Sequence, residues 1–252
     1  GRSRFVIECL QEVRKQVGED FPISIRISAE EIIKDGYTVE DMQSIMPILV
    51  EAGADIIHAS FGTHGSPGGI TSAPVEYEPG FKVELARKIK EVVKVPVIAV
   101  GRFTDPFMAD EIVTRGDADM IAFGRQHLAD PDFLINARLG RVQETFPCLA
   151  CNQGCIERLL FEQGSIRCAI NPETGQELEY PVQAAKKSKK VWVIGGGPGG
   201  LTAASEAARL GHQVTLFEAG KEAGGQVLLA ARVPYKKVYG RWIEVLNARA
   251  IK

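Results

Sequence analysis

The 252-residue sequence lacks long apolar runs and an excess of basic residues, and it has few cysteines. Each of these features bears on the class of protein. No apolar run approaches the roughly 20 residues that a membrane-spanning helix needs. Lysine and arginine (30) do not outnumber aspartate and glutamate (32), so no basic excess points to nucleic acid. Cysteine is also rare, with five residues in the chain. We therefore expect neither a membrane nor a nucleic-acid partner, in a chain long enough for one large or two ordinary domains.

Four of the five cysteines lie close together, with the spacing C-x2-C-x3-C-x12-C. Thiolates this close either form disulfides or hold a soft metal centre. Four thiolates suit an iron–sulfur cube; a tetrahedral zinc site is the alternative, although zinc ribbons usually present two CxxC pairs. Nothing resembles a secretory signal, which disfavours disulfides and indicates a reducing, cytoplasmic setting. The predicted metal ligands are Cys148, Cys151, Cys155 and Cys168, and Cys9 is interpreted as an ordinary thiol of a helix.

The first 145 residues alternate strand and helix patterns, which predicts an α/β fold with parallel strands and right-handed crossovers. Strands are expected at 22–28, 54–60, 95–101 and 119–124, and helices at 5–17, 38–52, 82–93, 105–115 and 131–139. Four strands do not close a barrel. Two details nevertheless favour the C-terminal half of a TIM (β/α)8 barrel over an open sheet.

The first detail is an internal repeat, VIAVGRFTDP against MIAFGRQHLADP, in which each strand ends in Gly-Arg. In eight-stranded barrels the loops after the last two strands commonly form a phosphate site. Gly101 and Gly124 would let backbone N–H groups reach a phosphate, and Arg102 and Arg125 would supply charge. Surface ion pairs are the alternative for the two arginines.

The second detail is Arg26, on the face of its strand opposite three isoleucines. It would point into the barrel, where a cation needs an anionic partner: the electron-rich edge of a reduced flavin, or a buried glutamate. His64 lies in the glycine-rich loop SFGTHGSPGGIT, on the expected catalytic face. It could donate a proton or orient a carbonyl, or simply be held by loop hydrogen bonds. His58 lies within a strand and is interpreted as structural.

After a basic stretch, AAKKSKK, interpreted as a linker, the sequence predicts strand, tight turn, helix and strand. Gly195, Gly197 and Gly200 fit G-x-G-x-x-G, which makes the turn, admits a pyrophosphate and allows close helix packing. Glu218 ends the second strand, where an acid binds a ribose diol. Gly225 indicates a second backbone approach to the cofactor, with a generic turn as the alternative. The pattern is typical of the start of a Rossmann-like FAD- or NAD(P)-binding domain.

In this order, the paired Gly-Arg loops, CLACNQGC, IGGGPGG and LFEAGKEAGGQ resemble the flavin- and iron–sulfur-containing branch of the old yellow enzyme family. That branch includes 2,4-dienoyl-CoA reductases, 2-enoate reductases, bile-acid-inducible NADH:flavin oxidoreductases and trimethylamine dehydrogenase. The resemblance covers essentially the whole chain. It implies an FMN-binding barrel half at 1–145, a 4Fe-4S cluster segment at 146–183 and part of a domain binding FAD (or ADP) at 184–252, with NAD(P)H as reductant.

Under this resemblance Arg26, Arg102, Gly124 and Arg125 match FMN contacts. His64 falls where the dienoyl-CoA reductases carry an active-site histidine. The four clustered cysteines match cluster ligands, and the three motif glycines with Glu218 and Gly225 match the adenine-dinucleotide site. The expected fold is thus a TIM-barrel half, an Fe-S segment and the start of a Rossmann-like domain.

The implied enzyme is an NAD(P)H:flavin oxidoreductase that reduces activated C=C bonds of a small enoate or enoyl-CoA through FAD, 4Fe-4S and FMN. An amine dehydrogenase of the trimethylamine dehydrogenase type is one alternative, and a non-catalytic zinc-stapled nucleotide-binding scaffold is another. Assembly into a homo-oligomer is left open. We expect the chain to be an internal fragment, inactive alone, of an enzyme of roughly 650 residues.

Overall fold

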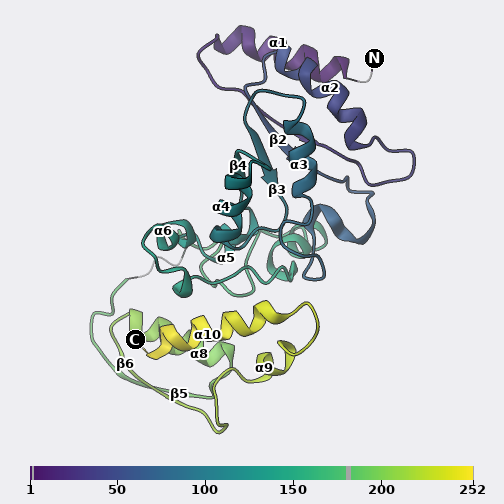
Figure 1. The fold of residues 1–252 in the computed structure, drawn as a ribbon. Helices are drawn as coiled ribbons and strands as arrows, with labels where there is room; N and C mark the ends of the chain where they lie inside the picture. Colours follow the sequence, from purple (N-terminus) through teal and green to yellow (C-terminus); the bar gives the residue numbers. More distant parts are fainter. Residues whose placement is uncertain (2, 180–182, 252) are drawn as a thin grey trace. The chain divides into compact units, whose positions relative to one another are not determined.

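The computed structural model describes residues 1, 3–179 and 183–251, and the chain divides into two compact units, 1–124 and 125–252. Each unit contains its own parallel sheet, of four strands in the first and two in the second (Figure 1). The predicted three-part division at 145 and 183 stays a prediction. Residues 180–182, at its second boundary, lie outside the described residues. Within the described part, no helix is long and apolar enough to cross a membrane.

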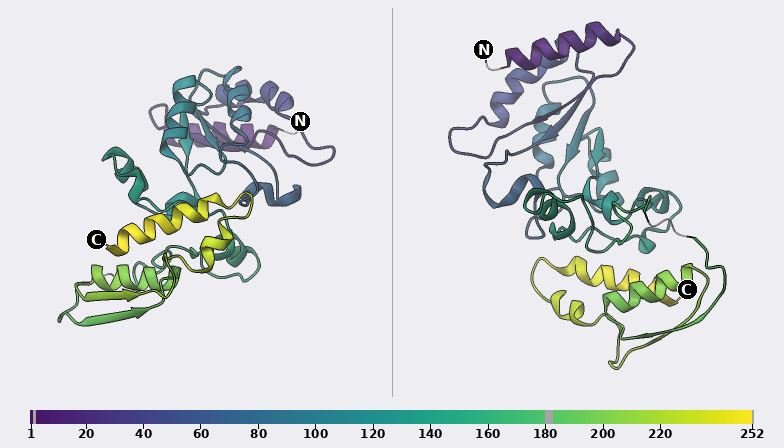
Figure 2. Two further views of the ribbon diagram at one scale, coloured as in Figure 1. Left: turned by 60° about the horizontal axis from the view of Figure 1, so that its bottom comes forward. Right: turned by 180° about the vertical axis from the view of Figure 1, so that it is seen from behind.

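The first unit alternates helices and strands as predicted. Its elements are α1 (Arg4–Val17), β1 (Ser24–Ser28), α2 (Val39–Glu51), β2 (Ile56–Ser60), α3 (Val83–Lys90), β3 (Val97–Val100), α4 (Pro106–Arg115) and β4 (Met120–Ala122). The strands pair in chain order, β1-β2-β3-β4, and all pairs are parallel. Helices α1 and α2 lie side by side (Figures 1 and 2). A 3-10 helix, η1 (Pro67–Ser72), in the loop after β2 was not predicted.

Local sequence fixes where two of these helices begin. The Thr38 hydroxyl accepts the Asp41 N–H at 3.4 Å, and the Asp41 carboxylate accepts the Thr38 N–H at 2.9 Å. These two bonds form a capping box, a class of contact that stabilises a helix by about 1 kcal/mol. Asp105 caps α4 by accepting the Phe107 N–H at 2.9 Å. Pro47 lies inside α2.

The two faces of the four-stranded sheet differ in what covers them. Side chains alternate between the faces along each strand. Ile57 and Val97 are fully buried at 0% exposure and pack in one core with residues of α2, α3 and α4. The register places Arg26 of β1 opposite His58 of β2, on the other face. Arg26 is exposed and His58 is half-buried, so this end of the face presents polar side chains rather than a closed core.

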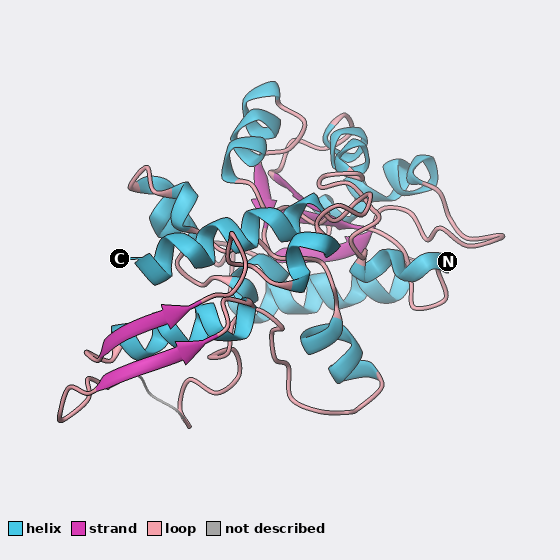
Figure 3. Cartoon of the chain, turned by 90° about the horizontal axis from the view of Figure 1, so that it is seen from below, coloured by secondary structure: helices cyan, strands magenta, loops and turns pink. Residues whose placement is uncertain are grey.

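The second unit joins the cysteine segment to the nucleotide-binding motif. Its elements are α5 (Arg125–Ala129), α6 (Phe133–Arg138), η2 (Val142–Glu144), η3 (Gln153–Glu157), α7 (Arg158–Leu160), β5 (Lys190–Ile194), α8 (Pro198–Arg209), β6 (Gln213–Phe217), α9 (Gln226–Ala230) and α10 (Lys237–Ile251). Helix α8 runs along β5 and β6, and α10 lies beside α8 (Figures 2 and 3). One core holds both parts together, with Phe146 and Leu149 beside Leu201, Trp242 and Leu246.

Candidate functional site

The four predicted metal ligands line one small cavity in the second unit. Cys148, Cys151, Cys155 and Cys168 share this cavity with Arg125. All four are free thiols; Cys155 is buried and the other three are half-buried. The spacing read from the sequence therefore does bring these side chains together. We call this space the cysteine cavity.

Electrostatics confirm that the sulfur atoms are close enough to interact. Burial raises the pKa of the Cys148 thiol to about 11, and it also raises the pKa of Cys155 and of Cys168. Charge on neighbouring cysteines raises these pKa values further, whereas the positive charge of Arg125 lowers those of Cys148 and Cys155. Because metal centres bind cysteines as thiolates, binding at this cavity would release the thiol protons.

Two residues give the cysteine cavity its shape. The Gly154 carbonyl accepts the Arg167 N–H at 2.7 Å, and a Cβ at Gly154 would lie 3.0 Å from the Ala169 nitrogen. Only a glycine allows this close passage, which brings Cys168 back to the other thiols. Gln126 is buried at 1% exposure. Its amide donates to the Phe146 carbonyl at 2.8 Å and accepts the Cys148 N–H at 2.8 Å, so it fixes the first ligand.

The loop between the first cysteines adopts left-handed backbone at two non-glycine residues. Ala150 has φ 51° and Asn152 has φ 62°. The first turns the Ala150 N–H toward the Cys148 sulfur, at 3.4 Å. The second presents the Asn152 side-chain oxygen to the Arg125 guanidinium, which donates a hydrogen bond to it. Such strained residues cluster at functional sites, and here both surround the thiols.

The donor set fits a thiolate-bound cluster. Among the described residues, no group of three metal-binding side chains is close enough to hold a single ion. A cube binds each thiolate through a different iron atom, so it needs four thiols around a shared cavity rather than around one point. Four thiols that line one cavity are the donors that a four-iron cluster takes. The role of the four cysteines as ligands stays a proposal.

The glycine motif forms a tight turn at the start of α8. Gly195 has φ 100°, in the left-handed region that favours glycine. A Cβ at Gly200 would lie 1.9 Å from the Gly195 carbonyl oxygen, so no side chain fits there. Nothing lies within 4 Å of a Cβ at Gly197, which leaves the helix N-terminus open to a ligand. The strand, turn and helix are those that cradle a pyrophosphate.

Glu218 and Gly225 come to this turn from elsewhere in the sequence. The Glu218 carboxylate accepts the Gly196 N–H at 2.6 Å and the Gly220 N–H at 2.7 Å. These donors lower the pKa of Glu218, so it is an exposed carboxylate suited to a ribose diol. A Cβ at Gly225 would lie 3.1 Å from the Gly197 Cα. Gly225 thus lies against the turn at Gly197, and its approach to a cofactor stays a prediction.

In the first unit, Arg26 is held by β2. Its Nη1 lies 2.5 Å from His58 Nε2, and its Nη2 donates to Ser60 Oγ at 3.0 Å. Burial first, and then the charge of Arg26, lower the pKa of His58 to about 4. His58 therefore belongs with the candidate site residues, although the sequence indicated only a structural role. The sequence did contain a signal for this. Side chains alternate between the two faces of a strand, and pairing of β1 with β2 places His58 on the face of Arg26.

The other first-unit candidates lie in loops that follow the strands. His64 is exposed, in a loop held by Ser66, whose hydroxyl accepts the Thr63 N–H at 2.8 Å. Arg102 has φ 61° and donates to the Val75 carbonyl at 3.1 Å. The Gly101 carbonyl accepts the Gly80 N–H at 2.7 Å, and nothing lies within 4 Å of a Cβ at Gly124. Their proposed contacts to a flavin are neither supported nor opposed by this geometry.

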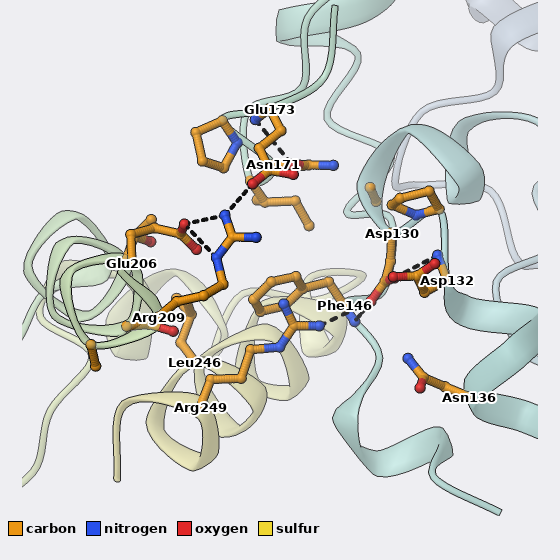
Figure 4. A pocket seen from close by; sticks show the side chains of 17 residues that line it. Asp130, Asp132, Asn136, Phe146, Asn171, Glu173, Glu206, Arg209, Leu246 and Arg249 are labelled. Carbon is orange, nitrogen blue, oxygen red and sulfur yellow. Dashed lines mark hydrogen bonds and ion pairs between the residues drawn. The ribbon is translucent and has the colours of Figure 1, made fainter. Parts of the chain in front are cut away.

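A larger cavity of about 490 Å³ lies among α8, α10 and the segments beside the cysteines (Figure 4). It contains none of the predicted site residues. Five of its charged side chains form ion pairs: Arg209 with Glu173 and Glu206, and Arg249 with Asp130 at 3.1 Å. The Arg249 guanidinium also lies 3.7 Å from the centre of the Phe146 ring. These pairs join the elements of the second unit.

Two family matches cover most of the chain. Residues 1–144 match the NADH:flavin oxidoreductase / NADH oxidase family, and residues 190–250 match FAD dependent oxidoreductases. The chain belongs to the NADH:flavin oxidoreductase / NADH oxidase family. This match confirms the family resemblance and the α/β fold class inferred from the sequence. FMN is the cofactor implied by the first match and FAD by the second.

Relatives in this family extend well beyond the chain. An NADH oxidase of Thermoanaerobacter brockii is 41% identical over 99% of the chain, which spans 39% of that protein. A solved 2-naphthoyl-CoA reductase complex is 34% identical, with a TM-score of 0.92 over 98% of the chain and 38% of that protein. Histamine dehydrogenase from Rhizobium sp. 4-9 is 28% identical, with a TM-score of 0.90 over 100% of the chain and 36% of that protein. The chain thus spans about two fifths of these relatives.

Proposed function

We propose that this chain is part of an NAD(P)H-dependent flavin oxidoreductase that reduces the activated C=C bond of an enoate or enoyl-CoA. One observation carries the proposal: four thiols line a single cavity in a chain that has a flavin-family match before them and a dinucleotide motif after them. When bound, FMN and FAD supply hydride transfer and a 4Fe-4S cluster supplies one-electron transfer. A cytoplasmic location and a small-molecule substrate belong to the same proposal.

The chain's own residues would hold these groups in three places. Cys148, Cys151, Cys155 and Cys168 would bind the cluster as thiolates after losing their protons. The turn at the start of α8, with Gly225 against it, would receive the FAD pyrophosphate, and the Glu218 carboxylate would accept hydrogen bonds from the ribose hydroxyls. On the sheet of the first unit, Arg26 would place its positive charge at the FMN pyrimidine edge.

Other residues, in loops that follow the strands, would complete the FMN site. We assign phosphate contacts to Gly101, Arg102, Gly124 and Arg125, and a proton-donating or substrate-orienting role to His64. The exposure of His64 in a loop after β2 suits this role, because active sites on barrels lie at the carboxyl ends of the strands.

The test is substrate-dependent turnover of the full-length enzyme, purified without oxygen. We expect NADH or NADPH to bleach the flavin absorbance, and cinnamate or an aromatic enoyl-CoA to restore it. The likeness to histamine dehydrogenase supports a second candidate, in which an amine is oxidised at the same site. That candidate predicts bleaching by the amine alone and no reoxidation by the alkene. A colourless protein containing zinc would contradict both and favour the scaffold alternative.

A further inference from the structure

Arg26 and His58 face each other across two neighbouring strands. They are direct partners in the β1–β2 register, and Ser60 lies two residues beyond His58 on the same face. The contact from Arg26 Nη1 to His58 Nε2 is 2.5 Å, and that from Arg26 Nη2 to Ser60 Oγ is 3.0 Å. Both terminal nitrogens of the Arg26 guanidinium are therefore held by side chains of one strand, β2.

The chemistry of this contact fixes the proton on His58. A guanidinium has N–H donors and no acceptor, so the imidazole nitrogen that meets Arg26 must be the acceptor. Nη1 lies 2.5 Å from Nε2 and 3.3 Å from Nδ1, so the shorter contact assigns the acceptor role to Nε2 and the ring proton to Nδ1. A second proton would place two like charges side by side and remove the acceptor. His58 is thus a neutral ligand to a cation.

Neutral partners distinguish Arg26 from the arginines that serve the fold of the same unit. Arg14 is paired with the Asp55 carboxylate, and Arg87 is paired with Glu84 and with Glu91, the latter at 2.5 Å. Those partners cancel the charge of the guanidinium. The imidazole and hydroxyl that hold Arg26 orient it without cancelling its charge, and the remaining N–H groups stay available.

We propose that His58 is a positioning residue which, together with Ser60, holds Arg26 ready for an anionic ligand edge. The ligand that suits a fixed cation on this face is the N1–C2=O edge of FMN, which carries negative charge in the reduced flavin. This inference rests on the proposed FMN site. Fixing the guanidinium in advance avoids a loss of side-chain freedom when FMN binds in either redox state. Because the fixed positive charge attracts the negative edge of the reduced flavin more strongly, the anchor favours reduced FMN over oxidised FMN.

The test uses full-length holoenzyme and the variants H58L, H58Q, S60A and R26Q. The readouts are the FMN midpoint potential and the dissociation constant of FMN. We expect H58L to weaken reduced FMN relative to oxidised FMN about tenfold, a fall of about 30 mV for a two-electron couple. H58Q, which keeps a neutral acceptor, should restore most of this, and S60A should shift the potential in the same direction as H58L. As a control, H212L should leave the potential unchanged, because the His212 ring accepts the Lys189 N–H at 3.3 Å and has no contact with Arg26 among those of the described residues.

A double-mutant comparison separates positioning from a structural role. If His58 acts through Arg26, the variant R26Q/H58L will have the potential of R26Q alone. Additive effects of the two substitutions, or an unchanged potential in both H58L and S60A, would overturn the inference. Absence of FMN from the wild-type holoenzyme would instead overturn the proposed function. Should H58L not fold, S60A and H58Q with R26Q still decide the outcome.

Discussion

The Arg125 guanidinium donates a hydrogen bond to the side-chain oxygen of Asn152, and both residues line the cysteine cavity. Arg125 was expected from the sequence as a phosphate contact after β4. Its place in the cysteine cavity has a second effect: its positive charge favours the thiolate forms of Cys148 and Cys155. In this structure Arg125 therefore stabilises negative charge at the thiols, and its phosphate contact stays a prediction.

This position predicts that R125Q lowers the potential of the cluster. A nearby cation stabilises the more negative reduced state, and its removal should change the ratio of reduced to oxidised cluster about tenfold, or about 60 mV for one electron. The measurement is a redox titration followed by electron paramagnetic resonance. R138Q is the control, since Arg138 is exposed on α6. Equal potentials in R125Q and wild type would contradict the prediction.

The close packing around Gly154 predicts that a larger side chain there impairs binding of the cluster. A Cβ there would press on the backbone of Ala169 and Cys168 at 3.0 Å, so G154A should displace the fourth thiol. Overpacking of this kind costs about 1–3 kcal/mol, and we expect iron and sulfide content to fall severalfold. G240A is a matched control, because a Cβ at Gly240 in α10 meets Ala231 at an ordinary 3.7 Å. Full iron content in G154A would show that Cys168 is not a required ligand.

The glycine turn at the start of α8 predicts that G200A loses FAD whereas G199A keeps it. In G200A the new methyl group would meet the Gly195 carbonyl oxygen at 1.9 Å, so the turn must open. We expect FAD affinity to fall at least about tenfold, equivalent to about 1.4 kcal/mol. G199A should bind FAD normally, because nothing lies within 4 Å of a Cβ there. Flavin released by acid and separated by chromatography measures both variants, and equal FAD in the two would oppose this assignment.

His58 predicts a pH dependence whose sign follows from linkage. Its pKa is about 4 in the folded protein and near 6.5 when unfolded, so the unfolded chain binds more protons between these values. Stability from this group is present above pH 6.5 and is lost as the pH falls toward 4. Because His58 is only half-buried, we expect a loss of about 1 kcal/mol between pH 7 and 5. Urea unfolding of wild type and H58Q at both pH values measures it; identical losses would exclude His58 as the source.

Much of the fold could be predicted because its signals are local. The capping box at Thr38, the alternation along β1 and the glycine motif before α8 each depend on neighbours in sequence. Helix α5 was missed because its five residues directly follow β4 and are too few to show a helical period. The stretch AAKKSKK was expected to be a linker, yet the Lys189 carbonyl accepts the Gln213 N–H at 2.8 Å beside β5. That contact is not encoded locally.

The same distinction applies to the site. The four cysteines were found from their spacing alone, since a cluster needs several thiolates in a short loop. Gln126, Asn152 and His58 were not found, because each acts through a partner at least 20 residues away. Contacts at that separation depend on how the strands and loops pack. The alternation of side chains along paired strands would have placed His58 beside Arg26. The hydrogen bond that makes His58 a candidate site residue could be seen only in the structure.

The content of iron and acid-labile sulfide in the anaerobically purified full-length enzyme tests the central claim most directly. The account predicts about four iron atoms and four sulfides per chain, lost together when Cys148, Cys151, Cys155 or Cys168 is replaced by serine. One zinc ion per chain with no sulfide would contradict it.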